Sequence, residues 1–268
     1  MKFSGTYTAP LRAITGGERA KTHLAIVQTD DGRSATAYIK SFAAGSDALL
    51  FNEVVGGWLA RAADIGTPEG GLMWVPASVL QTLFPGTPFP ESDGFVPSYA
   101  CAPVSNGYGI AAVGLGDAVG PMLDIVQRYL LDWPGFAACV AFDEWVANVD
   151  RHVNNLLIAA GGQIVPIDHS DCFGGPWRED AEFTQARQWY ANRLLEEYFL
   201  PEELPLPVKA GLIRASERWP GVRHHCAADL ARLSAWLGEQ RGLNWLQWLE
   251  TRADITAQLL RDRVRMLA

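Results

Sequence analysis

Residues 142–170, FDEWVANVDRHVNNLLIAAGGQIVPIDHS, are the stretch of sequence that decides the fold. They place Asp150 and Asn155 just before a short apolar run, a turn at Gly161 and Gly162, and a second apolar run that ends at Asp168. Two apolar runs joined by a glycine turn predict a small β-hairpin. The hairpin would carry two carboxylates and an amide at its ends, and such groups suit holding metal ions beside a phosphate.

The composition predicts a soluble globular protein with a real core, because 49% of its 268 residues are hydrophobic. The chain has 22 Lys and Arg residues against 30 Asp and Glu residues, a formal charge of −8. An acidic chain has no domain-wide basic surface, so we expect neither a nucleic-acid partner nor a membrane partner. No uncharged apolar run approaches the roughly 20 residues that span a bilayer, and we expect a cytoplasmic protein. Its four cysteines form no Cys-x-x-Cys pair, which favours reduced thiols over a zinc site.

Upstream of this stretch, residues 1–42 have the pattern of an antiparallel meander. Strand-like pieces lie at 6–8, 11–14, 23–28 and 34–39, with a turn at residues 30–32. Gly16 and Gly17 lie in the loop before the third piece. Such glycines let backbone N–H groups approach a phosphate, although turn geometry alone also accounts for a glycine pair.

Lys40 ends the last of these strands, and a helix with apolar residues at a spacing of three and four is expected at 46–62. Glu53 lies close to the apolar stripe of that helix. A carboxylate at such a position is costly to bury unless it is paired, and Lys40 is the available cation. The alternative is an ordinary exposed glutamate and a lysine that extends to solvent.

Residues 84–103 are rich in Pro, Gly and Ser and predict a linker between two lobes. We expect an α+β protein in which residues 1–100 form an antiparallel β-sheet lobe with one helix and residues 101–268 form a mainly helical lobe. Before the linker, 72–79 predicts an irregular strand that contains a proline. After it, apolar spacing predicts helices at 122–130, 136–146, 183–198, 207–218, 222–237, 245–250 and 255–266.

The order of the polar groups along the chain points to their chemistry. A strand lysine, Lys40, is followed by a helix glutamate, Glu53, a linker, Asp150 with Asn155 five residues later, and a strand-ending Asp168. These are the parts that phosphoryl transfer requires, in the order in which kinases carry them. Each residue alone has a simpler structural explanation, as part of a salt-bridged loop, a turn or a cap.

At these residues the sequence resembles the HipA-like kinases and, more distantly, the phosphatidylinositol 3- and 4-kinases, which share an Asp-Arg-His-x-x-Asn type of catalytic loop. The matching segments are 38–40 (YIK), 51–55 (FNEVV) leading to 66–68 (GTP), 148–155 (NVDRHVNN) and 167–169 (IDH). Together they span residues 38–170, roughly half of the chain. The resemblance implies a two-lobed, protein-kinase-like fold that uses ATP and Mg²⁺.

The resemblance also implies a role for each residue. Asp150 would orient and deprotonate the acceptor hydroxyl, while Asn155 and Asp168 would hold Mg²⁺ against the ATP phosphates. Lys40 would reach the α- and β-phosphates, and Glu53 would hold Lys40 in place. Gly16 and Gly17 would belong to the nucleotide loop, although this loop departs from the Gly-x-Gly-x-x-Gly form.

The resemblance implies a Ser/Thr kinase with a protein substrate and, as in toxin–antitoxin pairs, an antitoxin or another regulatory partner. A lipid or small-alcohol acceptor and a pseudokinase that only binds nucleotide are the alternatives. Asp168 is followed by His169 and Ser170 instead of the Phe-Gly of eukaryotic protein kinases, so the segment after it need not act as a phosphorylated activation loop. Self-phosphorylation is a further hypothesis, with acceptor candidates Thr15, Thr22 and Ser41 near the nucleotide loop.

Overall fold

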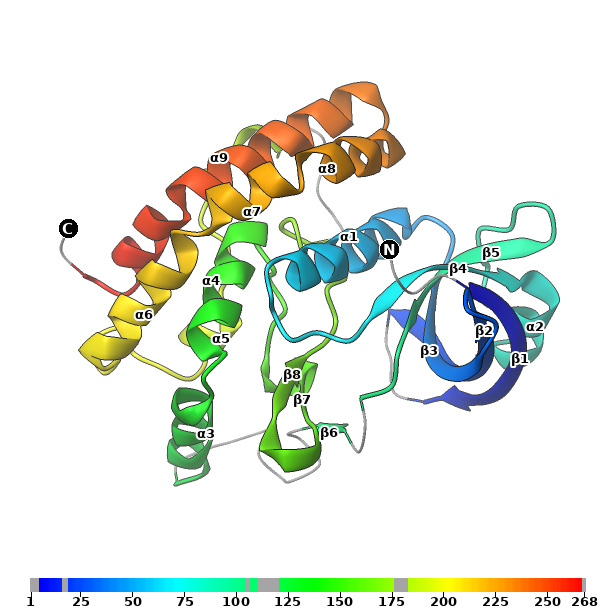
Figure 1. Cartoon of the computed structure of the whole chain (residues 1–268), viewed down its shortest axis with the longest axis horizontal. Coiled ribbons are helices and arrows are strands. Elements are labelled where there is room, and N and C mark those ends of the chain that lie inside the picture. Colours follow the sequence, from blue (N-terminus) through cyan, green and yellow to red (C-terminus); the bar gives the residue numbers. More distant parts are fainter. Residues whose placement is uncertain (1–4, 16–18, 105–106, 110–120, 176–182, 267–268) are drawn as a thin grey trace.

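The structure is a computed structural model that describes residues 5–15, 19–104, 107–109, 121–175 and 183–266. A twisted antiparallel sheet lies at one end of the molecule and helices make up the other end (Figure 1). The order of the strands in the sheet is β1-β2-β3-β5-β4. The strands are β1 Gly5–Ile14, β2 Ala20–Thr29, β3 Ser34–Phe42, β4 Gly70–Pro76 and β5 Phe95–Cys101.

Strand β3 shows how the sheet forms from the sequence. Its side chains alternate between the core and the opposite face, and Ala37, Ile39 and Ser41 are fully buried. Lys40 therefore lies on the face opposite to Ile39, where it is paired in register with Thr22 on β2 and Tyr99 on β5. The predicted antiparallel meander is confirmed, although the pieces expected at 6–8 and 11–14 form one strand, β1, and β3 continues past Lys40 to Phe42. The burial of Ser41 removes it as a candidate acceptor for self-phosphorylation.

Two helices accompany the sheet. Helix α1, Asp47–Ala62, matches the predicted helix. Helix α2, Ala77–Leu83, was not anticipated, because the segment 72–79 was expected to be strand throughout. Strand β4 ends at Pro76, and the helix begins at the next residue, since proline lacks the N–H that a sheet ladder needs but is tolerated where a helix starts.

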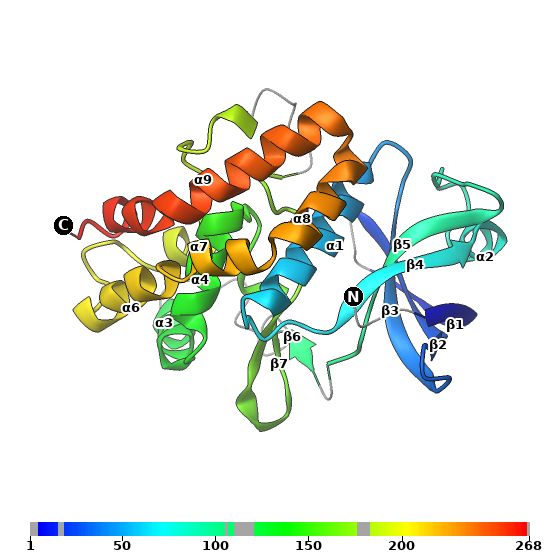
Figure 2. The same ribbon diagram turned by 45° about the horizontal axis from the view of Figure 1, so that its top comes forward.

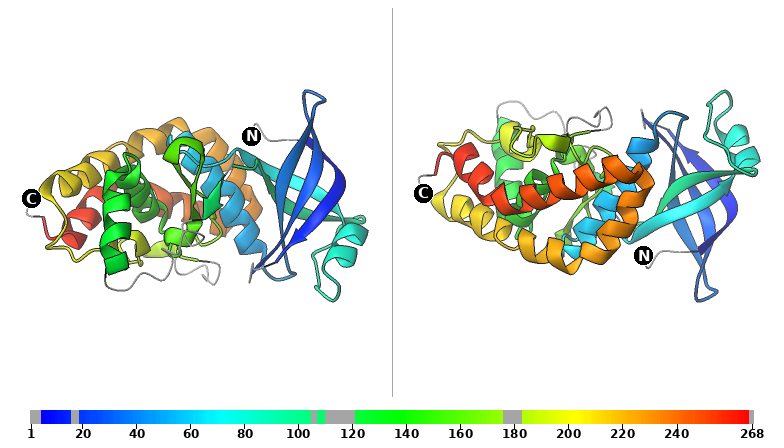
Figure 3. Two further views of the ribbon diagram at one scale, coloured as in Figure 1. Left: turned by 90° about the horizontal axis from the view of Figure 1, so that it is seen from below. Right: turned by 90° about the horizontal axis from the view of Figure 1, so that it is seen from above.

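Helix α1 is buried on nearly all sides. Leu49, Leu50 and Val54 pack with the sheet residues Phe42 and Tyr99. Its other side belongs to the core of the helical end, through the residues Phe51, Val55, Leu59 and Ala60. Views from other directions also show α1 between the sheet and the C-terminal helices (Figure 2; Figure 3). Apolar residues on two sides of α1 account for its enclosure by the protein.

The predicted hairpin is present in the C-terminal lobe. Strands β7, Leu156–Ile158, and β8, Ile164–Pro166, pair antiparallel, and β6, Tyr108–Gly109, adds a third strand beside β7. The turn needs two residues with positive φ, and Gly161 (φ 77°) and Gly162 (φ 78°) supply them at no steric cost. A short 3₁₀ helix, Val153–Asn155, precedes the hairpin. A second one, Ala160–Gly162, lies in its turn.

The remaining helices enclose a core built around four tryptophans. Trp145, Trp219, Trp245 and Trp248 are almost completely buried, as expected for residues that fill helix contacts. None of the helices in the described ranges is long and apolar enough to cross a membrane. The helices are α3 Pro121–Asp132, α4 Phe136–Val146, α5 Arg193–Glu196, α6 Leu206–Ser216, α7 Trp219–His225, α8 Ala227–Ser234 and α9 Glu239–Arg263, with a 3₁₀ turn at Ala235–Leu237.

Four of the predicted helices differ from the structure. The expected helix at 183–198 is reduced to α5, and the expected helix at 222–237 is divided among α7, α8 and the 3₁₀ turn. The two helices expected at 245–250 and 255–266 belong to one helix, α9, which spans Glu239–Arg263. The buried guanidinium of Arg252 explains the first difference, because it donates to the carbonyl oxygens of Ala186 (2.9 Å) and Gln188 (3.3 Å). Those oxygens accept from a side chain on α9 and not from a helical backbone.

Candidate active site

Lys40 and Glu53 form a buried ion pair between β3 and α1. The Lys40 ammonium donates to Oε1 of Glu53 at 2.8 Å, and the two side chains are 15% and 2% exposed. This is the predicted pairing, and the alternative of two separate, exposed side chains is wrong. Burial raises the pKa of Glu53 to about 7, although the charge of Lys40 opposes the shift.

Glu53 also links α1 to the segment that follows β8. Its Oε2 accepts from the backbone N–H of His169 at 2.8 Å. Gly56, one turn further along α1, allows the close approach, since a Cβ there would lie 2.8 Å from Sγ of Cys172 and 2.9 Å from Cβ of His169. The helix that holds Lys40 is therefore fastened directly to the residues around Asp168.

Asp168 is the second carboxylate beside Lys40. Its Oδ1 lies 3.3 Å from the Lys40 ammonium and accepts from the Ser170 hydroxyl at 2.9 Å. The backbone of Asp168 has φ 64°, a left-handed conformation that Asp tolerates better than most residues. Burial acts to raise the pKa of Asp168, but Lys40 and the Ser170 hydroxyl hold it below its usual range.

The loop before the hairpin brings Asp150 and Asn155 together. The Asn155 amide donates to the carbonyl oxygen of Asp150 at 2.8 Å, and the Asn148 side chain accepts from the backbone N–H of Asp150 at 3.2 Å. The hydrogen bond donated by the side-chain nitrogen of Asn155 fixes the orientation of the amide. The side-chain oxygen of Asn155 is then the atom suited to bind a cation. His152 accepts from the backbone N–H of Asn154 and so serves the turn.

Arg151 stabilises the loop from inside the core. Its guanidinium is fully buried, pairs with Asp143 at 3.2 Å and donates to the carbonyl oxygens of Ile167 and Asp168. It also lies 3.1 Å from Nδ1 of His169. Because a guanidinium can only donate, that nitrogen accepts, and Nε2 of His169 carries the proton that it shares with Thr67.

Three charged residues around Asp150 were not identified from the sequence. Arg19, at the start of β2, donates to Asp150 (3.2 Å) and to Asp171 (2.5 Å), and Arg193 of α5 donates to Asp150 from the other side. Burial raises the pKa of Asp171, with the Arg19 charge opposing the shift. The sequence signals that could have identified these residues are weak: Arg19 lies close to the glycine loop, and Asp171 lies close to Asp168. Gly16 and Gly17 themselves lie outside the described residues.

Two adjoining cavities lie between the lobes. The first, of about 260 Å³, is lined by Ile14 from the sheet and Leu157 from the hairpin, and such apolar side chains suit a flat base. The second, of about 230 Å³, contains Arg19, Asp150 and Asn155. Both are lined by Thr22, Lys40 and Asp168. A nucleotide whose base occupies the first cavity would therefore direct its phosphates past Lys40 into the second.

The residues present fit Mg²⁺ held jointly with a nucleotide. Asn155 and Asp168 line the same cavity and offer an amide oxygen and an ionised carboxylate, which are the oxygen ligands that Mg²⁺ takes. Among the described residues, no group of three or more His, Cys, Asp and Glu side chains is placed to hold a metal ion. Phosphate oxygens would have to complete the coordination, which is the usual mode for this ion.

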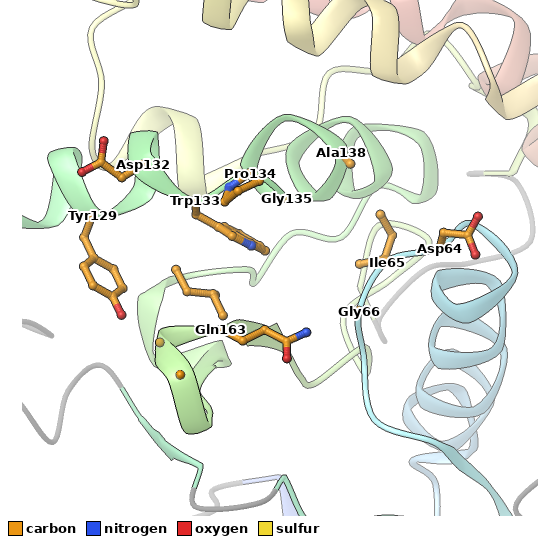
Figure 4. A pocket seen from close by; sticks show the side chains of 13 residues that line it. Asp64, Ile65, Gly66, Tyr129, Asp132, Trp133, Pro134, Gly135, Ala138 and Gln163 are labelled. Atoms are coloured by element: carbon orange, nitrogen blue, oxygen red, sulfur yellow. The ribbon is translucent and has the colours of Figure 1, made fainter.

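A larger cavity than these two, of about 730 Å³, lies elsewhere (Figure 4). It is bounded by the residues that follow α1, the turn between α3 and α4, and the hairpin turn, and it contains none of the predicted site residues. Trp133 and Gln163 extend into the space between these walls. Volume alone does not locate chemistry, so the site is assigned to the two smaller cavities, where ionisable groups of both lobes meet.

The fold and the site together define the class: the chain has a two-lobed, protein-kinase-like fold, with the Lys–Glu pair in one lobe and the Asp–Asn loop and Asp168 in the other. Asp168 was expected to end the second strand of the hairpin, but β8 ends two residues earlier, at Pro166. Among solved structures, the chain is similar to the crystal structure of a Helicobacter pylori proinflammatory kinase, CtkA, with a TM-score of 0.59 and 13% sequence identity. The similarity covers 97% of this chain and 96% of that one. No protein-family model and no curated protein sequence matches the chain.

Proposed function

We propose that the protein is an ATP- and Mg²⁺-dependent kinase of the HipA-like type that transfers the γ-phosphate to a Ser or Thr hydroxyl of a protein. The observation that carries the proposal is the meeting of Lys40, paired with Glu53, with Asp150, Asn155 and Asp168 at one cavity. The kinase fold of the solved neighbour supports it. Phosphoryl transfer needs little covalent chemistry from the protein, so positioned charges of this kind are what catalysis requires.

Each group has a defined task in this reaction. Lys40 binds the α- and β-phosphates, and Glu53 keeps its ammonium in place. Asp150 orients the acceptor hydroxyl. The hydroxyl oxygen attacks the γ-phosphorus, the bond from that phosphorus to the bridging oxygen breaks, ADP leaves, and the hydroxyl proton passes to Asp150. Asn155 and Asp168 would hold Mg²⁺, which neutralises charge on the phosphate oxygens.

The test is transfer of radiolabelled γ-phosphate to protein and, in parallel, to lipid extracts. We expect labelled protein, and we expect Asp150→Asn to lower turnover by about 10²–10⁴, the range for a positioned acid–base group. Asp132→Asn is the matched control, because this exposed aspartate borders the 730 Å³ cavity and not the site. Full activity in Asp150→Asn and in Asp168→Ala would overturn the assignment, and label confined to the lipid extract would change the acceptor class.

A further inference from the structure

Arg19 connects the two lobes directly across the mouth of the site. It precedes β2 of the sheet, yet both of its terminal nitrogens donate to carboxylates of the other lobe: Nη1 to Asp171 at 2.5 Å and Nη2 to Asp150 at 3.2 Å. The two contacts differ in their surroundings. Asp171 is almost fully buried, whereas Asp150 is 27% exposed and faces the cavity.

With Arg19 in this place, each oxygen of the proposed base accepts a hydrogen bond from a guanidinium. Oδ2 of Asp150 accepts from Arg19, and Oδ1 accepts from Arg193, which is itself held by Glu197 one turn along α5. A carboxylate oxygen that accepts from a guanidinium is a poor acceptor for a hydroxyl proton, because the charge that would attract the proton is already compensated. Opening one of the two contacts would therefore raise the ability of Asp150 to take the proton.

The expected path of the nucleotide identifies which contact opens. Arg19 lines the second cavity together with Lys40, Asn155 and Asp168, and it does not line the first, where the base would bind. A γ-phosphate placed there lies among these groups. Its oxygens carry more charge than one carboxylate and match the fork geometry of a guanidinium, so they compete with Asp150 for Arg19.

We propose that Arg19 is a positioning residue that exchanges partners when ATP binds: Nη2 moves from Asp150 to the γ-phosphate, while Nη1 stays on Asp171. The exchange rests on the proposed function, because it assumes ATP in this cleft. It leaves Oδ2 of Asp150 open to take the hydroxyl proton only when a γ-phosphate is present to be transferred. ADP has no γ-phosphate, and with ADP the contact between Arg19 and Asp150 remains.

The exchange predicts opposite effects for the two carboxylates that share Arg19. The quantity to measure is the ratio of affinities for adenylyl imidodiphosphate, a non-hydrolysable ATP analogue, and ADP, each with Mg²⁺, by calorimetry. Arg19→Ala should lower this ratio by about tenfold, the value of one charge-assisted hydrogen bond. Asp171→Asn should lower it by about threefold because the anchor is lost, and Asp150→Asn should raise it by about threefold because a competitor is lost.

A double-mutant cycle separates exchange from simple repulsion between Asp150 and the γ-phosphate. If Arg19 exchanges partners, Asp150→Asn raises the ratio in the wild-type chain but not in the Arg19→Ala chain. An equal rise in both chains, or an unchanged ratio in Arg19→Ala, overturns the proposal. Arg33→Ala is the matched control, since Arg33 is 83% exposed on the sheet and pairs only with Asp31 among the described residues.

Two further outcomes distinguish this inference from the function on which it rests. If the affinity ratios change as predicted but no phosphate is transferred, the exchange is supported and the kinase assignment is wrong. If phosphate is transferred but the affinity ratio does not change in Arg19→Ala, the kinase assignment is supported and the exchange is wrong. Absence of nucleotide binding to the wild-type chain would overturn both.

Discussion

His23 makes the stability of the sheet that carries Lys40 sensitive to acid. Its ring is fully buried on β2, opposite Ile39 and therefore one position from Lys40 in the register of the sheet. Nε2 lies 3.1 Å from the Tyr7 hydroxyl, and the buried Nδ1 has no hydrogen-bond partner among the described residues. Burial lowers the pKa of His23 to about 4, so the ring is neutral in the folded protein at pH 7.

The size of the effect follows from the two pKa values. The unfolded chain takes up the proton near pH 6.5 and the folded chain near pH 4. Between these values the unfolded state binds more protons, so the contribution of the neutral ring is complete above pH 6.5 and is lost as the pH falls toward 4. The full loss is about 3 kcal/mol, of which about 2 kcal/mol has gone at pH 5.

The assay is urea unfolding at pH 7.5 and pH 5.0 in the wild-type chain and in His23→Gln, whose amide can still bond Tyr7 but does not titrate. Any loss of unfolding free energy that the substitution causes equally at both pH values cancels in the comparison. The wild-type chain should lose about 2 kcal/mol more unfolding free energy than His23→Gln. His224→Gln, at an exposed histidine, is the control and should follow the wild type. Equal losses in the wild-type chain and His23→Gln would refute the reasoning.

Three other variants or measurements test the site and its supports. Asn52→Ala removes two buried hydrogen bonds, of 2.9 and 2.7 Å, from α1 to carbonyl groups just after Asp168, and should cost about 2–3 kcal/mol in urea unfolding. Arg151→Lys cannot replace the fork that holds Asp143, and calorimetry should show a loss of about 3–5 kcal/mol or failure to fold. Phosphopeptide mapping after incubation with ATP should find no phosphate on Ser41, which is buried and hydrogen-bonded in the sheet, and phosphate there would contradict the fold.

The parts of the site that could be predicted are those that local periodicity places. Alternation predicted a strand that carries Lys40, and the spacing in α1 placed Glu53 near a buried face. Their pairing followed from the cost of burying a lone carboxylate. The hairpin turn followed from its two glycines in the same way. These arguments use contacts within one element or between neighbouring elements.

The residues that escaped prediction depend on contacts between distant parts of the chain. Arg19 and Asp150 are 131 residues apart, and nothing in either segment signals the other. The same limit explains the lost helix at 183–192, where apolar spacing favours a helix but the guanidinium of Arg252 takes the carbonyl oxygens from 66 residues away. Tertiary contacts of this kind override a local pattern, and composition gives no sign of them.

Helix α1 contributes side chains to two hydrophobic cores at once, with Leu50 and Val54 in the core beneath the sheet and Phe51 and Val55 among the aromatic residues of the helical lobe. Unfolding of the sheet would therefore expose apolar surface of the other lobe as well. The free energies of the two lobes are coupled through this one helix, and they should melt in a single transition. A destabilising substitution on one side of α1 would then lower the midpoint of unfolding of the whole chain, including parts that the substituted residue does not contact.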